Sequence, residues 1–163
     1  MSTDDYVIVR LDSARIGLRA SAVDRVVQPV EITPLHQAPK IALGVINVHG
    51  TIIPVVNFRS RFGLPHREIA LNDRLVIART ALRSLAFVAD VVEGVFEYPE
   101  SDITDSSTVV SGLEAINGIA KGRGDIVFIH DLELFLSAGE ANSLDSAVAT
   151  LRSATDAEER NAS

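Results

Sequence analysis

The chain has 163 residues, 47% of them hydrophobic, with 15 Lys and Arg against 22 Asp and Glu and no cysteine. A chain of this length buries about 68 to 70% of the surface that its unfolded form exposes, which predicts one domain with an ordinary apolar core. The lack of cysteine excludes disulfides and cysteine-based zinc sites. The net charge of -7 disfavours a nucleic acid partner, because phosphate binding needs clustered Lys and Arg.

The N-terminus and the longest uncharged run bear on localisation. The first five residues are polar and acidic, and no apolar run with a cleavage site follows, so we expect no signal peptide and a cytoplasmic protein. Residues 41–58 carry no formal charge. Asn47, His49 and Thr51 would each need a hydrogen-bond partner in lipid, so we expect no membrane insertion.

Short runs rich in Val and Ile predict an all-β protein of about nine or ten strands. Turn-forming residues such as Asp12-Ser13 and Asn72-Asp73 separate the runs. The segment 41–58 is predicted to hold two buried strands that join at His49-Gly50. The other predicted strands, in chain order, cover residues 6–11, 15–20, 74–79, 84–89 and 91–98, with two more near 116–120 and 125–131.

Helical segments are expected to be few. Ala20 to Val27 predicts a short helical turn with three valines pointing inward, Val23, Val26 and Val27. Residues 131–137 predict a second turn, capped by Asp131. From Ser143 the chain shows an apolar stripe at helical spacing, formed by Leu144, Val148 and Leu151, whereas residues 155–163 have nothing to bury and are expected to be frayed.

Two blocks of sequence recur in the same order, which predicts a duplicated fold. Residues 16–28 align with residues 85–97, with identical residues at Ala20/Ala89, Val23/Val92 and Val26/Val95. Residues 50–62 align with residues 124–136. Two small barrels packed together follow from this repeat.

No motif for catalysis or metal binding is present. The sequence has no G-x-S-x-G elbow, P-loop or H-E-x-x-H, so we expect no catalytic residue and no cofactor. The four histidines have no neighbour at metal-ligand spacing, so no metal is expected: His36, His49, His66 and His130. Aromatic residues make up 5% of the chain without any Trp, too few for a base-stacking surface. A small-molecule-binding barrel stays open as an alternative and predicts a pocket with convergent polar groups.

Charges are unevenly distributed along the chain. The middle is basic, with Arg59, Arg61, Arg67, Arg74, Arg79 and Arg83. An acidic stretch follows, with Asp90, Glu93, Glu97, Glu100, Asp102 and Asp105. This pattern predicts an electrically polarised surface, and the alternative is a solvated rim that keeps the protein soluble.

The segment GVINVHGTIIPVVNFRSRFGL at 44–64 closely resembles the hallmark of the CheW-like adaptor domain. A second matching segment, GIAKGRGDIVFIHDLELFLS, follows at 118–137. The resemblance extends roughly over residues 5–137 and implies two packed five-stranded SH3-like β-barrels. We expect a domain over residues 1–139, with subdomains near 14–83 and 84–139 and the first strand crossing between them. A C-terminal helix and tail are expected over 140–163.

The resemblance implies a non-catalytic function in chemotaxis. CheW-like proteins couple chemoreceptors to the histidine kinase CheA in membrane-associated arrays. In that family, a groove between the barrels takes the receptor's helical tip, and barrel ends contact the kinase's regulatory domain. We therefore expect these two partners and a monomer when the protein is free. The alternative is a divergent scaffold or a kinase-sequestering regulator in a non-flagellar chemosensory pathway.

The same resemblance carries over candidate partner-binding residues. Three valines are candidates for the groove, or alternatively plain core: Val23, Val26 and Val27. Candidates for the neighbouring turn are Asn47, His49, Gly50 and Thr51, where Gly50 has the alternative role of a turn residue that needs unusual backbone angles. The candidate set also includes Arg25, Asn57 and Arg59.

Three of these positions depart from the family pattern. The family usually has Arg at the position of His49, an acidic residue at that of Arg25 and Asp at that of Asn57. If Arg25 and His49 face each other as the resemblance implies, the family's opposite-charge pair is lost here. This predicts partners with compensating changes, and the alternative is neutral drift at an exposed rim.

Overall fold

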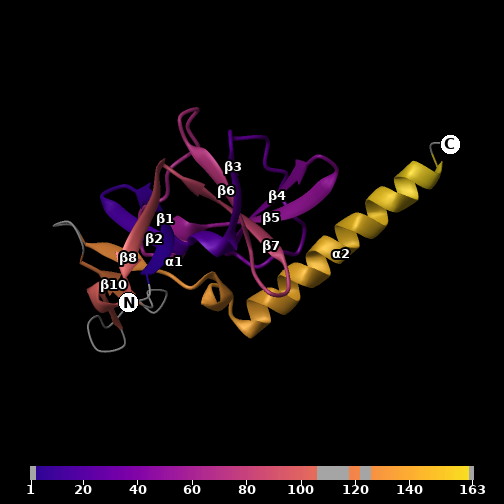
Figure 1. Ribbon diagram of the computed structural model, residues 1–163. Coiled ribbons are helices and arrows are strands. Elements are labelled where there is room, and N and C mark those ends of the chain that lie inside the picture. Colours follow the sequence, from indigo (N-terminus) through magenta and orange to yellow (C-terminus); the bar gives the residue numbers. More distant parts are fainter. Residues whose placement is uncertain (1–2, 106–117, 122–125, 162–163) are drawn as a thin grey trace.

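The computed structural model describes residues 3–105, 118–121 and 126–161 and places eleven strands in two sheets (Figure 1). Sheet A has the strand order β8-β1-β2-β11-β10-β9, and sheet B has the order β3-β6-β7-β5-β4. The strands of sheet A are β1 (Thr3–Leu11), β2 (Ala14–Arg19), β8 (Val91–Pro99), β9 (Ile103–Asp105), β10 (Gly118–Ala120) and β11 (Val127–Ile129). Those of sheet B are β3 (Val23–Val27), β4 (Ala42–Val48), β5 (Thr51–Val56), β6 (Arg74–Arg79) and β7 (Ser84–Ala89).

Within the described residues, five helical segments connect or follow the strands. They are η1 (Ala20–Ala22), α1 (Phe58–Arg61), η2 (Glu100–Asp102), η5 (Leu132–Leu134) and α2 (Ala138–Asn161). The predicted all-β fold class is confirmed, and so are the strand pair that joins at His49-Gly50 and the turn capped by Asp131. None of the helices in the described ranges is long and apolar enough to cross a membrane.

The described chain crosses between the two sheets twice. It leaves sheet A after β2, passes through η1 into sheet B, and returns at Asp90 between β7 and β8. Strand β1 pairs with β2 on one side and with β8 on the other, so the first two strands both belong to sheet A. The sheets are divided differently from the expected subdomains 14–83 and 84–139, since β2 lies in sheet A and β7 lies in sheet B.

The strand pairing confirms the sequence repeat. Strands β8, β1, β2, β11 and β10 correspond in order to β3, β6, β7, β5 and β4. In sheet B, Val55 pairs in parallel with Ala86, and in sheet A, Ile129 pairs in parallel with Gly17. These pairs are the ones that the two sequence alignments make equivalent. Both halves therefore share one topology and one register.

Sheet A curls back on itself, which gives it the form of a barrel. Strands β8 and β9 are its two edges, yet only the three residues of η2 separate them. Three residues span at most about 10 Å, so the two edges must lie close together. In sheet B, Thr33 pairs with Val45 of edge strand β4 shortly after the other edge strand, β3, ends at Val27, so the same closure occurs there.

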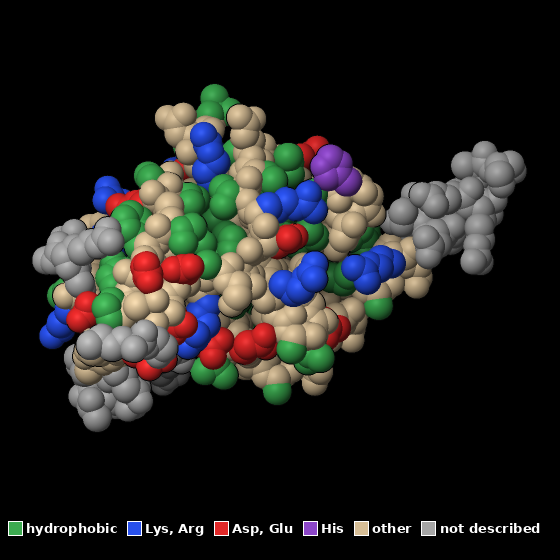
Figure 2. Space-filling model, viewed as in Figure 1, with side chains coloured by type: hydrophobic (Ala, Val, Ile, Leu, Met, Phe, Trp, Pro, Cys, Tyr) green, Lys and Arg blue, Asp and Glu red, His purple; other side chains and the backbone are tan. Residues whose placement is uncertain are grey.

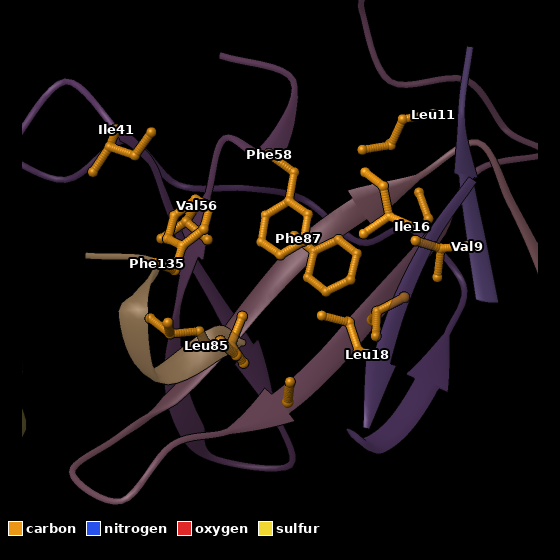
Figure 3. Close-up of a cluster of buried hydrophobic side chains, with 14 of the residues drawn as sticks. Val9, Leu11, Ile16, Leu18, Ile41, Val56, Phe58, Leu85, Phe87 and Phe135 are labelled. Carbon is orange, nitrogen blue, oxygen red and sulfur yellow. The ribbon is translucent and has the colours of Figure 1, made fainter. Parts of the chain in front are cut away.

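A shared apolar cluster joins the two sheets (Figure 3). Its centre is Phe58 of α1, whose ring stacks on Phe87 at a centroid distance of 3.7 Å and on Phe135 at 4.8 Å. Sheet A contributes further side chains, including Val9, Leu11, Ile16 and Leu18. Each sheet also encloses a smaller cluster of its own. Burial on this scale supplies the main stabilisation of the fold.

The C-terminal helix is longer than predicted. It begins at Ala138, two residues before the expected start at 140, and its backbone stays helical to Asn161, so the prediction of a frayed segment is wrong for residues 155–161. Residues 162–163 lie outside the described residues. Leu144 and Val148 are buried as predicted, and Leu151 packs against the shared cluster. Figure 1 shows the far end of α2 projecting beyond the sheets.

The predicted helical turn over Ala20 to Val27 is wrong beyond its first residues. Only η1 is helical, and Val23 to Val27 form strand β3, which pairs with β6. β-branched side chains fit a pleated strand better than a helix. Pairing with β6 supplies the hydrogen bonds that an isolated turn would lack.

Gly44 should be intolerant of a side chain because two segments touch there. Its φ is +151°, and an added Cβ would collide with the Thr33 carbonyl oxygen and approach Ile32 Cγ2 at 2.9 Å. We expect Gly44→Ala to lower the free energy of unfolding by about 2 to 4 kcal/mol, measured by urea denaturation. Gly63→Ala is the control, since Gly63 has a φ of +71° and open space around it. This change should lower the free energy of unfolding by only about 1 kcal/mol. Equal losses would contradict this account.

Candidate functional site

Matching β-bulges shape the edge strands β3 and β8. In β3 the pairing with β6 skips Asp24, and in β8 the pairing with β1 skips Glu93. These two residues are equivalent in the sequence repeat. A bulge inserts one extra residue and so shifts the alternation of side chains between the two faces of a strand.

The shift turns two valines of β3 toward the same side. Val23 and Val26 lie opposite Ala78 and Val76, which both belong to the shared apolar cluster. Residues directly opposite each other in a sheet point to the same face. Val27 instead lies opposite Leu75 and packs with the internal cluster of sheet B.

Strand β8 repeats this arrangement with Val92 and Val95, which lie opposite Val9 and Val7 of the shared cluster. Val23 and Val92 are partly buried against that cluster, whereas Val26 and Val95 are 39% and 62% exposed. We call the surface formed by Val23, Val26, Val92 and Val95 the β3–β8 face. Figure 2 shows hydrophobic side chains gathered between β8 and β3, with charged side chains around them.

The structure therefore separates the three valines that were predicted to point inward together. The prediction is wrong for Val26, which is exposed. The prediction also grouped Val27 with the other two valines, whereas Val27 faces the interior of sheet B and not the β3–β8 face. Arg25 directly precedes Val26. Its side chain is exposed and forms an ion pair with Asp24 at 3.8 Å. That Arg25 faces His49 stays a prediction.

The turn between β4 and β5 is shaped by its own residues. His49 and Gly50 both have positive φ, +51° and +87°, as a tight two-residue hairpin requires. The side-chain oxygen of Asn47 accepts a hydrogen bond from the Gly50 amide at 2.8 Å. Asn47 and Gly50 thus hold the turn, and His49 and Thr51 are exposed at its tip.

Two other candidates have internal partners. Asn57 caps α1, and its side-chain oxygen accepts a hydrogen bond from the Ser60 amide at 3.0 Å. Arg59 is buried. Its Nη2 contacts Asp12 Oδ1 at 3.0 Å and Asp90 Oδ2 at 2.7 Å, and its Nη1 donates to the Pro65 carbonyl at 3.1 Å. The side chains of Asn57 and Arg59 therefore bind other groups of this chain.

Asp90 is the centre of a charged network at the second crossing. Besides Arg59, its carboxylate accepts the Asp12 amide at 2.8 Å and Arg67 Nη2 at 2.6 Å. Arg67 in turn binds Asp73 at 2.7 Å. Burial alone would raise the pKa of Asp90, but the hydrogen bonds from Arg59, the Asp12 amide and Arg67 outweigh it, so that pKa is lowered. We call these five residues the Asp90 network.

Most of the basic middle of the chain is neutralised in this way. Arg59 and Arg67 bind the Asp90 network, while Arg61 binds Glu140 at 2.6 Å and Arg83 binds Asp145 at 2.9 Å. Arg83 also makes a second contact with Asp145, from Nε at 2.9 Å. The predicted polarised surface is therefore wrong for these arginines, because the fold pairs them with distant carboxylates.

Two hollows lie at equivalent places in the two halves, with volumes of about 300 and 220 Å³. Asn57 and Arg59 line the first, and their repeat partners Asp131 and Glu133 line the second. Some of their polar groups are bonded within the chain: Glu133 accepts the Ala81 amide at 2.7 Å, and the Asp131 side chain accepts the Glu133 amide. Among the described residues, no cluster of His, Asp and Glu could hold a metal ion.

Sequence reasoning missed part of this site. Val92 and Val95 were absent from the candidates, although the repeat aligns them with Val23 and Val26 and could have found them. Asp12 and Asp90 were also missed. No local pattern marks them, because 47 and 31 residues separate them from Arg59.

Comparisons with known proteins agree with this architecture. Residues 5–140 match the model of a family described as the CheW-like domain. The chain is 26% identical to a chemotaxis protein CheW of Rhizobium meliloti over 103 residues, 62% of this chain and 66% of that one. It is 25% identical to a chemotaxis protein CheW of Thermotoga maritima, covering 76% and 81%. The crystal structure of the scaffolding protein TtCheW from Thermoanaerobacter tengcongensis superposes with a TM-score of 0.78 and 27% identity, covering 85% of this chain and 96% of that one.

The lowered pKa of Asp90 predicts acid sensitivity. A carboxyl whose pKa is lower in the folded state stabilises the protein above its unfolded pKa, and this contribution is lost as the pH falls through the folded pKa. Asp90→Asn should lower the free energy of unfolding at pH 7 by about 1 to 3 kcal/mol and flatten its dependence on pH below about 5. Urea denaturation at several pH values measures both effects. The exposed Asp24→Asn is the control, and an equal loss in this variant would contradict the account.

Proposed function

The chain belongs to the CheW-like domain family, and from that premise we propose that it is a chemotaxis adaptor that couples chemoreceptors to a CheA-type histidine kinase. The observation that carries the proposal is the β3–β8 face. Two edge strands from different sheets present equivalent exposed valines beside a shared core. Exposed apolar surface arranged in this way is typical of a protein-binding site.

The partner at the β3–β8 face is the helical tip of a chemoreceptor. A helix binds such a surface through apolar side chains that repeat every three or four residues. Val26 and Val95 act as anchors, because they are exposed and sit on a rigid sheet. Val23 and Val92 form the floor against which the anchors pack. Arg25 is the exposed neighbour of Val26 in β3, and its charge sets partner preference.

The kinase's regulatory domain binds elsewhere, at the barrel end that carries the β4–β5 turn. His49 and Thr51 are exposed there and supply the polar contacts, while Asn47 and Gly50 fix the shape of the turn. Two separate surfaces let one chain hold both partners at once. Asn57 and Arg59 contribute indirectly, by holding α1 and the sheets in place.

The proposal includes a non-catalytic mode of action. The adaptor changes no bond and works by binding alone, as a monomer when free. It acts in the cytoplasm, at receptor arrays on the membrane surface.

Titration calorimetry tests the proposal with the cytoplasmic tip fragment of a chemoreceptor from the same genome. Wild type should bind, and Val26→Asp and Val95→Asp should each weaken binding about tenfold or more, because a charge replaces an apolar anchor. Leu82→Asp is the matched control: Leu82 is 81% exposed but lies at the β6–β7 turn, and this change should leave affinity unaltered. Binding that ignores Val26 and Val95 would contradict the assigned face. No binding by wild type to any receptor or kinase of the genome would contradict the function.

A further inference from the structure

The two strands of the β3–β8 face begin at the two points where the chain crosses between sheets. Strand β3 starts directly after η1, and β8 starts at Val91, the residue after Asp90. The position of each strand relative to the opposite sheet therefore depends on how its crossing is held.

The two crossings are held differently. Asp90 is bound to both sheets. Its amide donates to the Arg10 carbonyl of sheet A at 2.9 Å, and its carboxylate binds Arg59 of α1, the helix that comes directly after strand β5 of sheet B. Arg59 also reaches Asp12 in the β1–β2 turn of sheet A. The equivalent residue at the other crossing, Ser21 in η1, is exposed. A charged, largely buried clamp thus exists at the start of β8.

We propose that Arg59 and Asp90 are positioning residues for partner binding, because the Asp90 network sets the distance between the two strands of the β3–β8 face. Arg59 touches no partner in this scheme. Its planar guanidinium binds two carboxylates in fixed directions, which a lysine could not reproduce. Loss of the clamp frees the start of β8 and moves Val95 relative to Val26. The inference rests on the proposed function of that face.

The absence of cysteine makes a direct test simple. Spin labels are attached to the full chain at Val26→Cys and Val95→Cys, in the absence of a partner. Pulsed electron paramagnetic resonance then measures the distance between the two labels across the β3–β8 face. We expect Arg59→Gln and Asp90→Asn to broaden or shift the distance distribution. Arg83→Gln is the matched control, because it removes a similar two-contact pair, Arg83 with Asp145, that holds α2 instead. This control should leave the distribution unchanged.

Binding supplies the second readout, with unlabelled protein that keeps both valines. Arg59→Gln and Asp90→Asn should weaken binding of the receptor tip fragment roughly three- to thirtyfold, and the double variant should be no weaker than the worse single variant. Arg59→Lys should not restore the affinity. If Arg59→Gln does not fold, Arg67→Gln removes only the outer contact to Asp90 and Asp73 and should give a smaller change in the same direction.

The outcomes separate this inference from the proposed function. An unchanged distance distribution in the folded variants overturns the inference, even if wild type binds the receptor fragment. Weakened binding with an unchanged distribution also overturns it, because the effect would then be local to Arg59. Failure of wild type to bind any receptor fragment overturns the proposed function and leaves the distance measurement as a test of the clamp itself.

Discussion

The double crossing of the chain between its two sheets is the constraint on which the structure depends. Strands β1 and β2 come first in the sequence but pair with β8 and β11, so sheet A cannot form until the last strands are present. The two sheets then close around a shared cluster in which Phe58, Phe87 and Phe135 stack. Because more of the buried apolar residues belong to that cluster than to the two internal clusters together, neither half is expected to be stable without the other.

The repeat explains how the proposed binding surface arises from this arrangement. Equivalent bulges at Asp24 and Glu93 turn equivalent valines toward the junction of the sheets. Elsewhere the repeat has diverged: Arg59 binds a carboxylate in the β1–β2 turn, whereas its counterpart Glu133 binds an amide in the β6–β7 turn. The two halves thus hold each other by reciprocal contacts of different chemistry. These contacts matter for the proposed function, because a binding face built from two sheets keeps its shape only if the sheets stay fixed relative to each other.

The sequence predicted the strands and the repeat well, because buried strands of Val and Ile between turn residues have few alternatives. It was misleading at Val23 to Val27. Apolar residues three apart suggest a helix, but the bulge at Asp24 produces the same spacing in a strand, and nothing in the residue type marks the bulge. The partners of Arg59 were invisible for another reason: ion pairs between residues 31 and 47 positions apart depend on the topology. The helical continuation of α2 to Asn161 also exceeds what its apolar stripe predicts.

If one chain binds a receptor and a kinase at separate surfaces, as proposed, the three proteins should form a ternary complex. The protein, the regulatory domain of a CheA-type kinase and a receptor tip fragment from the same genome are mixed and analysed by size-exclusion chromatography with light scattering. We expect a species whose mass includes all three components, because the β3–β8 face and the β4–β5 turn share no residue. Displacement of one partner by the other would contradict it.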